Sequence, residues 1–160
     1  GPGAFCANET DTLSDFTVGG TWSATSTSVA TINPVTGVLY GVAATGGTST
    51  VTYTLPTGCV ATGFVVVNPL PGSITGTAEI CMGSSTIFTN PTPFGTWSSN
   101  NTSIATVGST SGEVTAVSPG IVTISYTLLA TGCYITKQVT VNPVPPSISG
   151  TPLYSEYLYL

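Results

Sequence analysis

The sequence predicts an all-β protein made of two tandem β-sandwich domains and a C-terminal strand-forming tail. One pattern occurs twice along the 160 residues, apolar residues alternate with hydroxyl residues, and glycine and proline recur between the short apolar runs. No stretch shows the 3.6-residue periodicity of an amphipathic helix. We expect one domain over residues 1–69, a second over 70–143, and a linker and strand over 144–160.

The repeat is clearest around the two tryptophans. The stretch "GTWSATSTSVATI" (20–32) returns as "GTWSSNNTSIATV" (95–107), 75 residues later. Cys6 and Cys81 are the same distance apart, and motifs further along match at offsets of 74 or 73. The small drift falls between motifs, where loops absorb insertions. Two copies of one structural unit are therefore predicted.

Within each unit the elements are predicted to be strands. Residues 30–42 and 105–117 each indicate a strand, a glycine turn and a second strand. Residues 48–55 and 121–128 then alternate apolar and hydroxyl side chains, which is typical of a sheet with one buried face. Short β-branched strands separated by turns favour a sandwich or barrel.

Each unit contains two cysteines, Cys6 and Cys59 in the first and Cys81 and Cys133 in the second. Their spacings of 53 and 52 residues favour one disulfide inside each unit. Zinc is the poorer interpretation, because the chain has no histidine and no CxxC pair. Disulfides imply an oxidising compartment outside the cytoplasm, and a bridge of this loop length contributes about 4 kcal/mol.

The chain is unusually poor in charge. Only 4% of its residues are charged, with a single Lys or Arg and a net charge of −5, against about 25% charged residues in ordinary domains. A single positively charged side chain is too few to form a phosphate-binding surface. Neither nucleic acid nor an anionic membrane is therefore expected as a partner. No apolar run is long enough for membrane insertion, and no signal peptide is visible, so either it was removed or the chain is an excerpt.

A protein with so few charges on an uncovered surface would associate or precipitate. Either neighbouring molecules bury it or covalent glycans cover it. Three sequons offer glycosylation candidates, at Asn8, Asn100 and Asn101.

Catalysis is not expected, and we predict no catalytic residue, cofactor or metal site. The chain has no histidine, and its one cation, Lys137, is interpreted as an exposed solubilising charge on a strand. Three acids, Glu9, Asp11 and Asp15, could supply some oxygen ligands to calcium, but the second unit lacks them and a solvated loop is favoured.

The two tryptophans admit two interpretations. Trp22 and Trp97 could be platforms on which sugars stack. Their identical strand contexts favour packing anchors in the core of each sandwich.

Residues 95–127, "GTWSSNNTSIATVGSTSGEVTAVSPGIVTISYT", resemble the bacterial immunoglobulin-like domain of the second group. The segments 74–90 and 133–143 are similar to the cysteine-containing version in surface proteins of Bacteroidetes-type bacteria. The resemblance implies two tandem immunoglobulin-like domains at the cell surface, in stalks, spacers or adhesin tips. It brings no catalytic residues.

The two units differ at their openings. The second opens with "SITGT" (73–77), which the start of the first unit lacks, and a similar "SISGT" (147–151) follows the second unit. The segment 144–160 is expected to complete the first unit of the next molecule by strand addition. Two alternatives are a third repeat cut short and a tail packed on its own molecule. The predicted assembly residues are Leu153, Tyr154, Tyr157, Leu158, Tyr159 and Leu160.

The expected function is therefore structural. We expect a protomer or segment of an extracellular bacterial fibre or stalk, whose partners are copies of itself joined head to tail. The alternative is an adhesin-type module that recognises carbohydrate or another cell surface.

Overall fold

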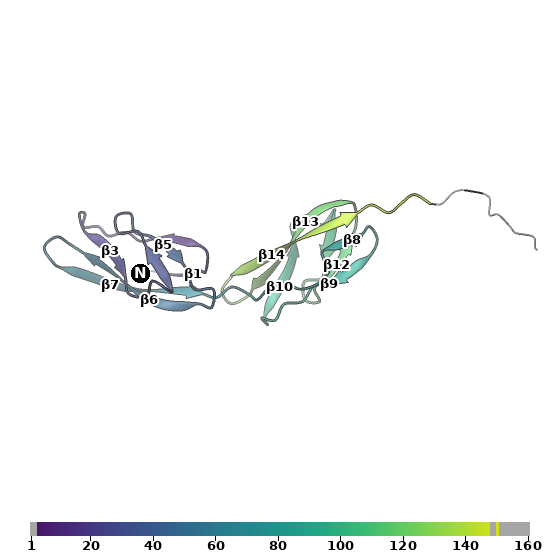
Figure 1. The fold of residues 1–160 in the computed structure, drawn as a ribbon. Helices are drawn as coiled ribbons and strands as arrows, with labels where there is room; N and C mark the ends of the chain where they lie inside the picture. The colour runs from purple at the N-terminus through teal and green to yellow at the C-terminus, as the bar shows by residue number, and fades with distance from the viewer. Residues whose placement is uncertain (1–2, 148–149, 151–160) are drawn as a thin grey trace, which may run out of the picture.

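The computed structural model describes residues 3–147 and Gly150. Two β-sandwich units lie end to end (Figure 1). The described residues form no helix, and so none that is long and apolar enough to cross a membrane. The first unit comprises β1 (Ala4–Cys6), β2 (Thr10–Thr12), β3 (Thr21–Ala24), β4 (Ala30–Ile32), β5 (Val38–Gly41), β6 (Gly47–Thr54) and β7 (Val60–Asn68).

The second unit repeats this series of strands. It comprises β8 (Glu79–Cys81), β9 (Ser85–Ile87), β10 (Gly95–Ser99), β11 (Ala105–Val107), β12 (Glu113–Ala116), β13 (Gly120–Leu128) and β14 (Tyr134–Asn142). The predicted all-β fold with two tandem sandwiches is confirmed. The predicted assembly tail, Leu153 to Leu160, lies outside the described residues.

Both units have the same sheet topology. One sheet has the order β1-β7-β6-β3 and faces a sheet of order β2-β5-β4; in the second unit the orders are β8-β14-β13-β10 and β9-β12-β11. The first strand of each unit runs parallel to the last, so that Cys6 is in register with Asn68 and Cys81 with Asn142. All other strand pairs are antiparallel.

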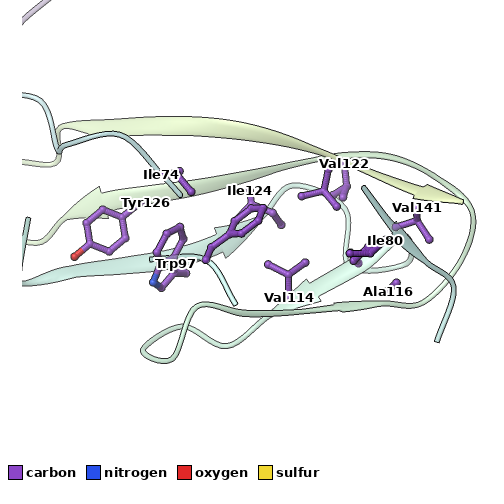
Figure 2. Close-up of a cluster of buried hydrophobic side chains, with 12 residues drawn as sticks. Ile74, Ile80, Trp97, Val114, Ala116, Val122, Ile124, Tyr126 and Val141 are labelled. Atoms are coloured by element: carbon purple, nitrogen blue, oxygen red, sulfur yellow. The ribbon is translucent and has the colours of Figure 1, made fainter. Parts of the chain in front are cut away.

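The alternating sequence produces the buried faces. In β13, the side chains of Val122, Ile124 and Tyr126 are buried, while their neighbours are more exposed. Each unit has its own core, and that of the second is larger. Figure 2 shows the core of the second unit. Trp97 is 6% exposed and belongs to the core, as predicted, whereas Trp22 is only half-buried.

The predicted disulfide pairing is wrong. Cys6 is bonded to Cys133 of the second unit, across 127 residues, with a Cα–Cα distance of 5.6 Å. Cys59 and Cys81, each expected to pair within its own unit, are free and exposed. The bond therefore joins the two units at their junction instead of closing a loop inside either one.

The length of the last strand explains this correction. Cys6 is in register with Asn68 at the end of β7, whereas Cys59 precedes the start of the same strand. Nine residues of extended chain separate two such positions by about 30 Å, far beyond the reach of a disulfide. Cys81 and Cys133 are separated in the same way by β14.

The junction between the units is short. Leu70 packs against the core of the first unit, and its backbone N–H donates to the carbonyl oxygen of Ala44 at 3.3 Å. Two residues later, the N–H of Gly72 donates to Oγ1 of Thr92 in the second unit at 2.8 Å. Because only one residue separates Leu70 from Gly72 and a disulfide also joins the two units, the joint between the units is stiff.

Candidate functional site

The first unit contains an open cleft of about 430 Å³ between its two sheets. Its floor is formed by Trp22 from the edge strand β3 and by Val51 and Tyr53 from the neighbouring β6. The segment 11–15 forms one wall, and residues 61–63 at the start of β7 form the other. Gly3 also lines the cleft.

The aromatic floor has the same geometry in both units. The ring centroids of Trp22 and Tyr53 are 4.6 Å apart, as are those of Trp97 and Tyr126. The hydroxyl of Tyr53 donates to the carbonyl oxygen of Thr17 at 2.8 Å and accepts a bond from the N–H of Gly20 at 2.9 Å. Both units thus hold the tyrosine in place in the same way, because the second makes the two equivalent bonds.

In the second unit the equivalent cleft is filled by its opening segment. Ile74 is 8% exposed and lies in the core at the end marked by Trp97 and Tyr126 (Figure 2). Phe88 and Trp97 are buried there, whereas the matching Leu13 and Trp22 of the first unit are half-buried. An apolar side chain at the position of Ile74 therefore accounts for the difference in burial between the two cores.

Backbone bonds hold this segment in the second unit. Thr75 and Thr89 exchange two N–H to carbonyl bonds of 3.0 and 3.1 Å, and their hydroxyl oxygens lie 2.7 Å apart. Ser14 is the matching residue of the first unit and lines its cleft. Among the residues that the structure describes, neither the N–H nor the C=O of Ser14 has a hydrogen-bond partner. The first unit thus offers a free backbone edge where the second has a paired one.

Lys137 makes a further contact to the opening segment. Its Nζ donates to the carbonyl oxygen of Gly76 at 2.9 Å and to that of Ile74 at 3.3 Å, and lies 5.3 Å from the ring centroid of Phe88. The interpretation of Lys137 as an exposed solubilising charge is therefore wrong. In the first unit Gly63 and Ala61 replace Lys137 and Ile135, which widens the cleft.

The acidic residues near the cleft serve local turns. The Oδ1 of Asp11 accepts a bond from the N–H of Thr12, and that of Asp15 from the N–H of Thr17, each at 2.8 Å. Within residues 3–147, no group of three or more metal-ligating side chains is close enough to hold an ion. The cleft therefore has an aromatic floor, two carboxylates that accept hydrogen bonds from their own turns, and the unpaired backbone edge at Ser14.

The glycosylation candidates are all exposed. Asn8 lies in a turn at a φ of +64°, next to the bonded Cys6. The Oδ1 of Asn100 accepts a bond from the N–H of Thr123, and that of Asn101 from the N–H of Ser103. Their modification stays a prediction.

Residues 85–141 match the family model of the bacterial Ig-like domain (group 2). The second unit is a bacterial Ig-like domain. The first unit has the same strand order and a repeated sequence, so the chain contains two such Ig-like units in tandem.

Solved structures with bacterial and animal Ig-like sandwiches are similar to this tandem. A C-terminal 282-residue fragment of intimin, in complex with the intimin-binding domain of its translocated receptor, is 19% identical with a TM-score of 0.43, covering 77% of this chain and 51% of that one. The S-layer protein SbsC (31–844) is 19% identical with a TM-score of 0.29, over 79% and 20%. N-cadherin of Drosophila is 12% identical with a TM-score of 0.36, over 89% and 64%.

The Ig-like chain therefore spans about half of the intimin fragment and a fifth of the S-layer protein. No protein of curated function matches the sequence.

Proposed function

We propose that this chain is a structural protomer of an extracellular bacterial fibre or stalk, assembled head to tail by strand addition. Residues 147–151 of one copy enter the open cleft in the first unit of the next copy. Ile148 then occupies the position that Ile74 holds in the second unit. The role is mechanical, not catalytic, and the partners are further copies of the chain.

The difference between the two units carries this proposal. The cleft of the first unit is open where Ile74 fills that of the second, and "SISGT" (147–151) repeats "SITGT" (73–77). The linkers that precede the two segments, 141–147 and 67–73, are both rich in proline. The free N–H and C=O of Ser14 offer an incoming strand the two bonds that Thr89 makes to Thr75.

The geometry of the existing joint supports growth in one direction. The two units lie end to end (Figure 1). The acceptor cleft belongs to the first unit, and the donor sequence follows the second unit along the chain. Contacts between different surfaces on two copies generate open filaments unless the rotation closes a ring. An in-line joint repeated between copies extends a rod.

The composition supports an extracellular location. A disulfide joins the two units, and such bonds persist in oxidising compartments. Burial in an assembly, or glycans on Asn8, Asn100 or Asn101, would cover a surface with few charges.

Two complementary variants test strand addition. Ile148→Asp leaves the cleft intact but places a charge on the inserting side chain, whereas Ser14→Pro removes the acceptor N–H and leaves the donor intact. We expect filaments from the wild-type chain by electron microscopy, monomers from each variant alone, and only dimers from a mixture of the two. Ser147→Ala, at the position that matches the exposed Ser73 of the second unit, is the matched control and keeps the filaments.

Two results would overturn strand addition. One is filament formation by the Ile148→Asp chain at wild-type yield. The other is a wild-type chain of residues 1–160 that stays monomeric in light scattering at all concentrations, as expected if the occupant of the cleft is a segment preceding Gly1 in a longer polypeptide.

A second candidate function uses the same cleft. Trp22 is half-buried beside Asp11 and Asp15, and an accessible aromatic ring next to carboxylates suits carbohydrate binding by an adhesin-type module. Quenching of Trp22 fluorescence by glycans, in a Trp97→Phe chain that carries Ile148→Asp, would favour this function. Unchanged emission across a glycan panel would exclude it.

A further inference from the structure

We propose that Cys81 of one copy forms a disulfide with Cys59 of the next copy. This inference rests on the proposed head-to-tail assembly and adds a covalent lock to each joint. The bond would reproduce, between two molecules, the bond that already joins the two units within one molecule.

The repeat relates the free cysteines to the bonded pair. Cys81 matches Cys6, at the end of the unit where the chain leaves, and Cys59 matches Cys133, at the end where the neighbouring unit docks. Within the chain, the bond runs from the Cys6 position of the earlier unit to the Cys133 position of the later one. The same rule applied to the next joint pairs Cys81 with Cys59 of the following copy.

The backbone around each free thiol matches that of its bonded counterpart. The N–H of Leu55 donates to the carbonyl oxygen of Cys59, as that of Leu128 does to that of Cys133; the second turn is one residue longer, and both contain a glycine with positive φ before the cysteine. Around the other pair, the carbonyl oxygens of Cys6 and Cys81 accept from the N–H groups three residues later, in Glu9 and Ser84. Both free cysteines thus have backbone hydrogen bonds similar to those of their bonded counterparts.

The free cysteines also lie at the two outer ends of the molecule. Cys59 precedes β7, at the end of the first unit away from the junction. Cys81 is the last residue of β8, in register with Asn142 at the far end of the second unit. Both are exposed, while the bonded Cys6 and Cys133 are 8% and 0% exposed. A bond between them inside one molecule is therefore excluded, and a second copy brings them together.

The energetics of strand addition favour such a lock. Strand addition buries one isoleucine and adds two backbone hydrogen bonds at each joint. Association also costs translational and rotational freedom, so the inserted segment alone holds copies together weakly. A disulfide makes the joint persist when the segment dissociates locally.

The chemistry needs an electron acceptor, for which we name a small-molecule disulfide. The Cys59 thiolate attacks this disulfide, forms a mixed disulfide and releases one small thiolate. The Cys81 thiolate of the neighbouring copy then attacks the Cys59 sulfur, forming the Cys59–Cys81 bond and releasing the second small thiolate. Two protons pass from the protein thiols to the two released thiolates, and the small disulfide is reduced.

Single-cysteine variants test the pairing directly. Cys59→Ser retains only the free Cys81, and Cys81→Ser only the free Cys59. In a buffer of oxidised and reduced glutathione, we expect each variant alone to stay monomeric on a non-reducing gel and an equimolar mixture to form a cross-linked dimer. The wild-type chain forms a ladder, and the double variant forms none. The chain has one lysine and no arginine, so a protease that cleaves after these residues would cut it only once. The linked peptides are therefore mapped after pepsin digestion.

The outcomes separate the lock from strand addition. Wild-type filaments whose Cys59 and Cys81 both remain open to alkylation overturn the lock and leave strand addition intact. The lock is also overturned if either single-cysteine variant alone forms as much cross-linked dimer as the mixture does. That result would show that any two free cysteines are oxidised without selection. A mapped Cys59–Cys81 link supports it. If Ile148→Asp lowers the yield of that link at least tenfold, insertion precedes the bond; an undiminished yield supports the lock and overturns strand addition.

Discussion

Lys137 on β14 donates a hydrogen bond to the carbonyl oxygen of Gly76, with 2.9 Å between Nζ and the oxygen. A second bond reaches the carbonyl of Ile74 at 3.3 Å. The chain has a single Lys or Arg, and it holds the opening segment on the second unit. The first unit has Gly63 at this position, beside its open cleft.

Replacing this lysine should weaken the second unit. We expect Lys137→Met to lower its free energy of unfolding by about 1–2 kcal/mol, because the carbonyl oxygens of Ile74 and Gly76 lose a partly exposed charged donor. Urea unfolding followed by Trp97 fluorescence in a Trp22→Phe background measures the change. Gln138→Met, at the exposed neighbouring position of β14, is the control. An equal loss in both variants would contradict a specific role for Lys137.

Truncating Ile74 should open the core of the second unit, so that Trp97 becomes as exposed as Trp22 is in the first unit. We expect Ile74→Ala to cost about 2–4 kcal/mol of unfolding free energy, because a buried side chain is lost from the core, and to shift Trp97 emission to longer wavelength. Ile121→Ala, at a site that is 63% exposed, should change neither quantity appreciably. Unchanged Trp97 emission in the Ile74 variant would show that this side chain does not seal the core.

The disulfide arrangement has a simple chemical test. In the freshly purified monomer without reductant, an alkylating reagent should modify Cys59 and Cys81, because both are free and exposed. Cys6 and Cys133 should react only after reduction. Intact mass and peptide mapping give the count and the positions. A monomer in which no cysteine reacts would instead fit one bond inside each unit.

The repeat predicted most of the fold from local signals. Alternation in segments such as 121–128 specifies which face of a strand is buried, so both sandwiches followed from the residues. The cleft was predictable only as the absence of a matching "SITGT" at the start of the first unit. The role of Lys137 was not, because its partners are backbone carbonyls 61 and 63 residues away that carry no sequence signal.

By itself, the order of residues determined two copies of one β unit and their strands and turns. Only the tertiary structure decided which cysteines bond and which segment fills a core. The cysteine spacings of 53 and 52 residues in the two repeats are compatible with bonds inside units or between them. A nine-residue strand places Cys6 and Cys59 at opposite ends of the first sandwich, and the end-to-end docking of the next unit places Cys133 beside Cys6.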